Sequence, residues 1–214
     1  KEVAFEDIRQ AVLLAQELYI KNGFGTIQDG SGSDRLYFEA MAKIADEGCL
    51  KADVAIYLTP KPEDSSFWKD ALARFGKTYH SHLKVCGIKM FLDGSPQART
   101  AWLLEPYAGE STYRGYPTLT EEDTSLFVEN AIDSGMQTIA HCNGSAASEQ
   151  FLRVWEKACV KKGTGAHLRP IMIHAQTVTY DQLERMAKIG MVPSFFIGHC
   201  YFWGDVHLKN LGER

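Results

Sequence analysis

The sequence lacks the patterns that mark several common classes of protein. It contains no Cys-x-x-Cys pair, no Gly-x-Gly-x-x-Gly after a strand-like run and no Walker lysine motif. The last two absences argue against the nucleotide-binding versions of an open α/β sheet. No apolar run is long enough to span a bilayer, and the chain opens in an amphipathic pattern rather than a signal peptide. We therefore expect no membrane partner.

The sequence also lacks an excess of positive charge, since 23 Lys and Arg residues stand against 27 Asp and Glu residues. The formal net charge is −4, so nucleic acid is not expected as the main partner. Cysteine occurs only five times, at scattered positions that suggest free thiols rather than a disulfide framework. These features predict a protein of a reducing compartment, the cytoplasm.

The content of the sequence is that of a globular protein. Its 214 residues are 45% hydrophobic, which predicts a single domain over residues 1–214 with a real core. Strand-like apolar runs alternate with amphipathic helical patterns, which is typical of a parallel sheet built from βαβ units. The predicted strands are Gly25–Gln28, Ala52–Thr59, Leu83–Leu92, Met136–His141, Leu168–His174 and Val192–Ile197.

Polar side chains stand at or just beyond the carboxyl ends of these runs. In a (β/α)8 barrel all such ends face one mouth, where catalytic residues lie, so this pattern favours a barrel over an open sheet. The fold predicted is therefore α/β, a parallel (β/α)8 TIM-type barrel, incomplete here with about six βα units. The residues in question are Asp29, Lys89, Asp93, His141, Asn143, His174 and His199.

Three of these residues carry the strongest chemical signal. Lys89 lies inside an apolar run, where a buried ammonium must reach solvent, find a carboxylate or do chemistry. His141 and His174 each close an apolar run, and imidazole is a common ligand of Zn²⁺ and similar ions. Either histidine alone is also compatible with a hydrogen-bonded core residue. A metal site at the barrel mouth formed by all three residues is the hypothesis.

Four segments, in a fixed order, carry a resemblance to a known family. From about Gly25 to its end, the sequence resembles the amidohydrolase superfamily, in particular its YtcJ-like branch of metal-dependent hydrolases. The most specific pieces are His-Ala-Gln at 174–176 and Trp-Gly-Asp at 203–205. The matching segments are Gly87–Ser95 with Arg99–Ala101, Gln137–Gly144, Arg169–Gln176 and Pro193–Asp205.

The resemblance implies a chemistry as well as a fold. It implies hydrolysis of amide or related carbon–nitrogen bonds in a small substrate, by water activated on one or two divalent ions, with zinc expected. Lys89 would be a carboxylated metal ligand, and His141 and His174 would be the ligands from strands five and six of the barrel.

The sequence also departs from the family pattern. The His-x-His pair of the first strand and the Asp of the last strand are absent, as is the small β-sandwich, and Ser145 and Ile173 replace the usual Asp and Glu. The chain has no initiator methionine, so we expect a processed chain or a piece of a longer enzyme. The missing ligands predict low metal occupancy and little activity for this chain by itself. Two open sheet edges would favour pairing with another copy.

Other residues leave alternatives open. Arg99 would contact substrate or pin its long loop, and His199 and Trp203 would line the substrate pocket or cover the barrel rim. Two other functions remain: a metal-free domain for binding or oligomerisation, and a phosphate-handling barrel isomerase. The histidines read as surface residues are His80, His82, His167 and His207.

Overall fold

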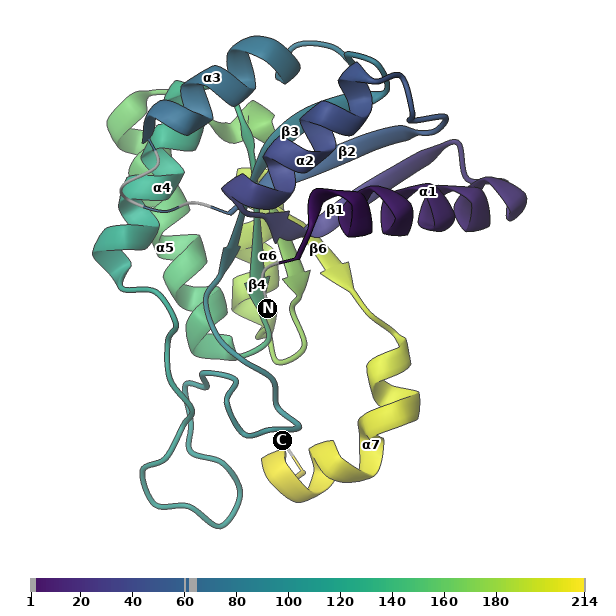
Figure 1. Cartoon of the computed structure of the whole chain (residues 1–214). Coiled ribbons are helices and arrows are strands. Elements are labelled where there is room, and N and C mark those ends of the chain that lie inside the picture. Colours follow the sequence, from purple (N-terminus) through teal and green to yellow (C-terminus); the bar gives the residue numbers. More distant parts are fainter. Residues whose placement is uncertain (1–2, 60, 62–64, 214) are drawn as a thin grey trace. The chain divides into compact units, whose positions relative to one another are not determined.

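A computed structural model describes residues 3–59, 61 and 65–213, and the described chain divides into two compact units, 1–89 and 90–214. Each unit is a run of alternating helices and strands (Figure 1). The first unit contains α1 (Phe5–Lys21), β1 (Thr26–Ser33), α2 (Arg35–Asp46), β2 (Asp53–Leu58), α3 (Ser65–Phe75) and most of β3 (Leu83–Phe91). The second unit contains α4 (Glu121–Asp133), β4 (Gln137–Cys142), α5 (Ser145–Lys162), the short 3₁₀ helix η2 (Ala166–Leu168), β5 (Ile171–His174), α6 (Tyr180–Ile189), β6 (Val192–Phe195) and α7 (Gly198–Leu211).

The six strands form one sheet in the order β1-β2-β3-β4-β5-β6. The register is parallel between β1 and β2, β2 and β3, β4 and β5, and β5 and β6. Strands that follow one another in chain order, with a helix in each crossover, are the arrangement of a (β/α) barrel. The predicted fold class, an incomplete parallel barrel, is therefore confirmed.

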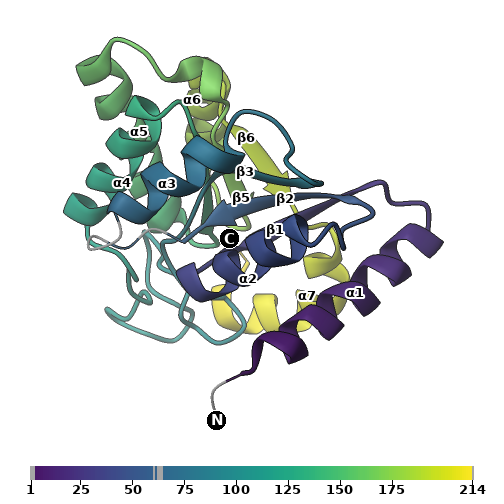
Figure 2. The same ribbon diagram turned by 45° about the horizontal axis from the view of Figure 1, so that its top comes forward.

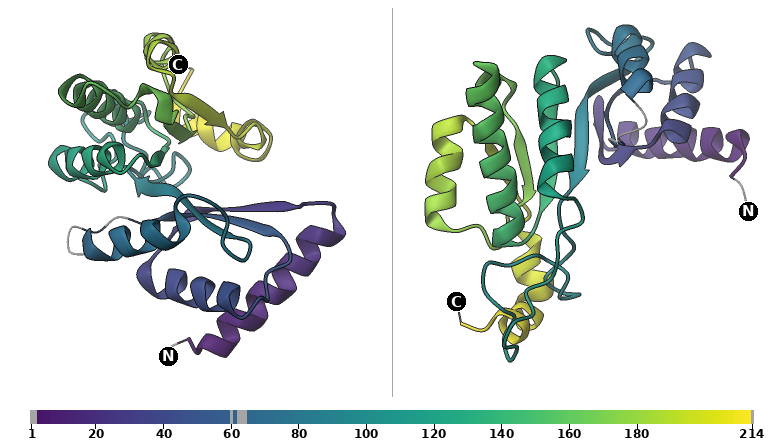
Figure 3. Two further views of the ribbon diagram at one scale, coloured as in Figure 1. Left: turned by 90° about the horizontal axis from the view of Figure 1, so that it is seen from above. Right: turned by 90° about the vertical axis from the view of Figure 1, so that its left-hand side faces the viewer.

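Helices cover the strands within each unit. In the first unit, α1 and α2 lie beside β1 and β2 (Figure 2). In the second unit, α4, α5 and α6 stand in a row alongside the strands (Figure 3). The interior here is apolar, with Ile139 and Met172 from the strands and Phe151 and Trp155 from α5 all fully buried. This packing holds the ends of β4 and β5 in place. None of the described helices combines the length and hydrophobicity needed to cross a membrane.

Side-chain caps fix the beginnings of three helices. The Asp34 carboxylate accepts a hydrogen bond from the backbone N–H of Tyr37 at the start of α2. Thr179 and Gln182 form a full reciprocal capping box at the start of α6, in keeping with their spacing in the sequence. At α4 the Thr120 hydroxyl accepts a hydrogen bond from the backbone N–H of Asp123 and also donates to the Asp123 carboxylate.

The structure differs from the sequence pattern at several element boundaries. The segment from residue 199 onward, where the sequence shows no clear period, forms α7. Apolar side chains such as Phe202 and Leu208 are exposed around this helix, so its sequence has no single apolar face to detect. β5 begins at Ile171 rather than Leu168, because η2 and the left-handed Arg169 precede it. β1 continues to Ser33, since its glycine-rich end pairs with β2 through an irregular register.

Candidate metal centre

Two imidazoles meet at the carboxyl edge of the second unit. His141 on β4 and His174 at the end of β5 lie on adjacent parallel strands, where Cys142 is the register partner of His174. Their ring centroids are 4.8 Å apart and the rings are nearly perpendicular. The common direction of the two strands brings the side chains together, as the positions of the two residues at strand ends predicted.

The backbone at the end of β5 is unusual. His174 and the following Ala175 both have positive φ angles, 73° and 47°. Consecutive left-handed residues other than glycine are costly and concentrate at functional sites. The Ala175 N–H donates to the Cys142 carbonyl at 3.0 Å, which ties this turn to β4. The strained turn therefore fixes the direction in which the His174 side chain leaves the strand.

A third imidazole joins the pair from α7. His199 Nε2 lies 3.1 Å from His174 Nδ1, within hydrogen-bonding distance. Burial lowers the pKa of His199, and the nearby His207 lowers it further. Burial also lowers the pKa of His207, whose ring centroid is 6.4 Å from that of His199. His207, predicted to be a surface residue, lies on α7 and is partly exposed.

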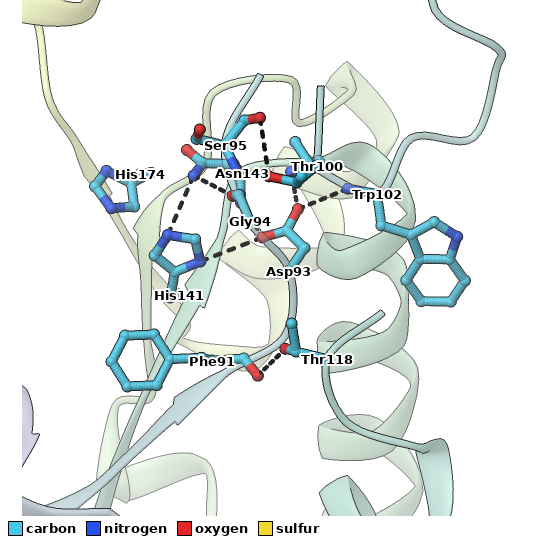
Figure 4. A network of polar contacts seen from close by, with 12 residues as sticks. Phe91, Asp93, Gly94, Ser95, Thr100, Trp102, Thr118, His141, Asn143 and His174 are labelled. Atoms are coloured by element: carbon cyan, nitrogen blue, oxygen red, sulfur yellow. Dashed lines mark hydrogen bonds and ion pairs between the residues drawn. The ribbon is translucent and has the colours of Figure 1, made fainter. Parts of the chain in front are cut away.

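A buried carboxylate lies behind His141. The Asp93 side chain is fully buried and accepts three backbone hydrogen bonds, from Trp102 at 3.0 Å, Asn143 at 2.9 Å and Gly144 at 2.6 Å (Figure 4). Its Oδ1 is also 3.2 Å from His141 Nδ1. The sequence placed Asp93 among the polar strand-end residues but assigned it no role. The donors from Asn143 and Gly144 lie 50 and 51 residues away in the sequence, and no local pattern reveals them.

An amide network continues on the other side of the His141 ring. The Asn143 side chain is almost fully buried. Its Nδ2 donates to the Gly94 carbonyl at 2.7 Å and lies 3.2 Å from His141 Nε2 (Figure 4). Its Oδ1 accepts from Gln176 Nε2 at 2.5 Å. His141 is therefore contacted at both nitrogens by side chains that are themselves held in place.

The other predicted site residues occupy different surroundings. Lys89 lies on β3 with 3% of its surface exposed and belongs to the first unit, so its approach to the histidines stays a prediction. Arg99 has a positive φ and donates to Glu110 at 2.8 Å, and its guanidinium lies over the Tyr107 ring. These contacts favour the loop-pinning alternative for Arg99. Trp203 lies on α7 with 43% of its surface exposed, and its role in substrate binding stays a prediction.

A pocket of about 440 Å³ lies in the second unit close to these residues. Gln176 belongs both to its wall and to the amide network that reaches His141. Such a mixed apolar and polar lining suits a small organic molecule. The lining residues are Leu103, Leu104, Glu105, Ser145, Gln176, Thr177, Val178, Thr179 and Leu211.

The donor set fits a divalent ion in part. Two imidazoles in contact, one of them backed by a carboxylate, are the kind of ligand and supporting group that bind zinc and similar ions. Within the described ranges, no group of three or more His, Cys, Asp or Glu side chains is placed to hold a metal ion. The described His, Cys, Asp and Glu side chains therefore offer a pair of ligands and not a complete shell.

Comparisons with known sequences point to one family. A sequence model described as "Amidohydrolase family" matches residues 1–212. The putative amidohydrolase YtcJ of Bacillus subtilis is 32% identical over 108 residues, covering 50% of this chain and 20% of that protein. The Arabidopsis thaliana protein LONG AFTER FAR-RED 3 is 23% identical over 229 residues, covering 100% of this chain and 38% of that protein.

Solved structures agree with this match. An uncharacterized metal-dependent hydrolase from Pyrococcus furiosus superposes with a TM-score of 0.84 at 26% identity, covering 100% of this chain and 42% of the other. A second uncharacterized metal-dependent hydrolase, from Pyrococcus horikoshii, gives 0.82 at 25% identity, covering 99% and 41%. The chain thus spans well under half the length of these relatives.

Proposed function

Since the chain belongs to the amidohydrolase family, we propose that it forms the central part of a metal-dependent hydrolase that cleaves amide or other carbon–nitrogen bonds. The observation that carries this proposal is the contact between His141 and His174 at the carboxyl edge of adjacent strands. The metal-dependent hydrolases among the structural neighbours support a divalent ion here, and two neutral imidazoles suit zinc.

Each residue has a distinct part in this proposal. His141 and His174 are metal ligands, and Lys89 is a third ligand if carbon dioxide converts its amine to a carbamate. When bound, the ion would polarise a substrate carbonyl and lower the pKa of its water. His199 holds the His174 ring through the 3.1 Å contact, which gives it a positioning role in addition to the predicted contact with substrate.

The pocket supports a small-molecule substrate. Its volume of about 440 Å³ is within the range of ligand sites, and Gln176 connects its wall to the amide network around His141. We propose that an amide-like substrate places its non-reacting part in this pocket. A second copy of the chain is another proposed partner, because β1 and β6 stand at the two ends of the sheet and their edges would allow strand pairing.

Metal affinity should depend on the rest of the longer protein. A catalytic zinc site normally has three protein ligands and an open position for water. This chain offers two imidazoles and a lysine that ligates only after carboxylation, while covering 42% of a solved relative. We therefore expect weak metal binding and little turnover from residues 1–214 alone.

The test compares two proteins at equal concentration. Zinc content by plasma mass spectrometry and hydrolysis of a panel of N-acyl amides are measured for residues 1–214 and for the full-length protein. We expect zinc and turnover in the full-length protein and a large loss of both in the shorter one. Equal turnover per chain would show that these residues make a complete site. A full-length protein without bound metal or hydrolytic activity would refute the proposed function.

A further inference from the structure

The hydrogen bonds around His141 define which ring nitrogen carries the proton. The Gly94 carbonyl only accepts hydrogen bonds, so the Asn143 side-chain atom 2.7 Å from it is the amide nitrogen. The same amide nitrogen lies 3.2 Å from His141 Nε2. An amide nitrogen only donates, and Nε2 must therefore present its lone pair. In a neutral ring the proton is then on Nδ1.

The partner on the opposite side of the ring agrees with this assignment. Asp93 Oδ1 lies 3.2 Å from His141 Nδ1, and this oxygen already accepts a hydrogen bond from the Asn143 N–H, so it faces the ring as an acceptor. The contact is a close approach of the two atoms rather than a hydrogen bond, and Nδ1 forms no hydrogen bond within the described part of the chain. The two neighbours of the ring, reached from independent segments, nevertheless require the same tautomer.

We propose that Asp93 is the positioning residue of His141, which it holds as the neutral Nδ1–H tautomer with the Nε2 lone pair available to a cation. This assignment rests on the proposed metal-binding function only in naming the cation. Asn143 occupies Nε2 when no cation is bound and yields the position while keeping its bond to Gly94. Asp93 thereby sets which atom of His141 faces the site.

Asp93 suits this role because three backbone hydrogen bonds hold its own side chain in place. Its Oδ2 accepts the backbone N–H groups of Trp102 and Gly144, and its Oδ1 accepts that of Asn143. The carboxylate is fully buried and stands at the beginning of α5, where the helix dipole favours negative charge. It cannot turn away from His141 without leaving backbone donors unpaired. An amide at this position would present a donor to at least one of these groups.

Asp93→Asn makes the proposal testable. If the amide oxygen stays with the two donors at Oδ2, the new NH₂ group faces Nδ1 and favours the Nε2–H tautomer. Nitrogen-15 NMR of histidine-labelled protein at pH 8 distinguishes the two tautomers through one-bond and two-bond couplings, and His141→Gln identifies the His141 signals. We expect Nδ1–H in the native protein and Nε2–H in Asp93→Asn. Asp181→Asn, an exposed aspartate in the first turn of α6, is the matched control and should change nothing.

A second variant separates the role of Asp93 from that of its neighbour. Asn143→Ala removes the donor to Nε2 and leaves Asp93 in place, so His141 should remain Nδ1–H. This variant and the native protein decide the question if Asp93→Asn does not fold. An Nε2–H tautomer in the native protein, or in Asn143→Ala, overturns the proposal.

Zinc titration links the tautomer to metal binding without relying on activity. In the full-length protein zinc should perturb His141 Nε2 and leave Nδ1 protonated, and Asp93→Asn should weaken binding about 10–100-fold, the usual effect of losing a group that orients a ligand. If zinc fails to bind the native protein while the Nδ1–H tautomer is observed, the proposed metal site fails and the positioning role of Asp93 stands. Perturbation at Nδ1 instead would overturn the assignment of Nε2 as the exposed atom.

Discussion

Gly144 is a position where the structure predicts a severe effect of adding a single methyl group. A Cβ there would lie 1.9 Å from the Trp102 carbonyl oxygen and 2.7 Å from the Trp102 nitrogen, both of them backbone atoms. The φ and ψ angles of Gly144, −86° and 150°, are accessible to alanine. The substitution Gly144→Ala therefore tests close approach alone, without backbone strain.

The cost follows from what the displaced backbone holds. The Trp102 carbonyl accepts hydrogen bonds from the first turn of α5 at 3.0 and 3.3 Å. The N–H groups of Trp102 and Gly144 donate to the Asp93 carboxylate. Two neutral bonds and two bonds to a charged group together amount to about 4–9 kcal/mol if all are lost. Partial relaxation retains some of them, so we expect the free energy of unfolding to fall by about 3–5 kcal/mol, a large share of the ~5–15 kcal/mol of a typical domain.

Urea denaturation followed by circular dichroism measures this loss. Gly204→Ala is the matched control, because Gly204 lies inside α7 with open space where its Cβ would stand. Alanine there should raise stability by up to about 1 kcal/mol through helix propensity. If Gly144→Ala unfolds within ~0.5 kcal/mol of the native protein, the contact between Gly144 and Trp102 is not as close as described, and the reasoning fails.

Three further predictions concern charge, capping and the site. The Arg153 hydrogen bond lowers the pKa of Glu121 to about 2, so the ionised pair stabilises the fold above pH ~4.5 and its contribution is lost as pH falls towards 2. In Glu121→Gln the free energy of unfolding should therefore fall less steeply over this pH range than in the native protein, as acid unfolding measures. Thr179→Ala should cost about 1 kcal/mol in urea denaturation by removing the cap of α6, and an unchanged midpoint would contradict the capping role. In the full-length protein, the proposed metal site predicts that His174→Ala abolishes zinc binding and turnover, whereas substitution of the exposed His167 (His167→Ala) leaves both intact.

The architecture was predictable because it depends on local patterns. Apolar runs of strand length alternating with amphipathic helices give a parallel sheet, and the caps at Asp34, Thr120 and Thr179 follow from side chains within three residues of the N–H groups they bind. The meeting of His141 and His174 was predictable for the same reason, since parallel neighbours end at one edge of a sheet. These inferences need only residue spacing and the direction of the chain.

The remaining features depend on contacts between distant segments. α7 is attached through Asn210, whose buried side chain donates to the Pro96 carbonyl, 114 residues earlier in the chain. The aromatic residues of the segment are exposed and show no helical period in the sequence. Sequence spacing does not reveal a helix whose position depends on contacts with residues so far away in the chain.

Asp93 shows how closely stability and chemistry are joined in this fold. Its carboxylate holds the start of α5 through Asn143 and Gly144, and the same atom Oδ1 stands beside the His141 ring. Replacing Asp93 by alanine would therefore destabilise the unit and free the imidazole at once, and loss of activity alone would not distinguish the two effects. Asparagine nearly preserves the volume, replaces one acceptor by a donor and removes the negative charge. A reversed tautomer in a folded Asp93→Asn protein would thus assign the orienting role to the carboxylate itself rather than to the packing around it.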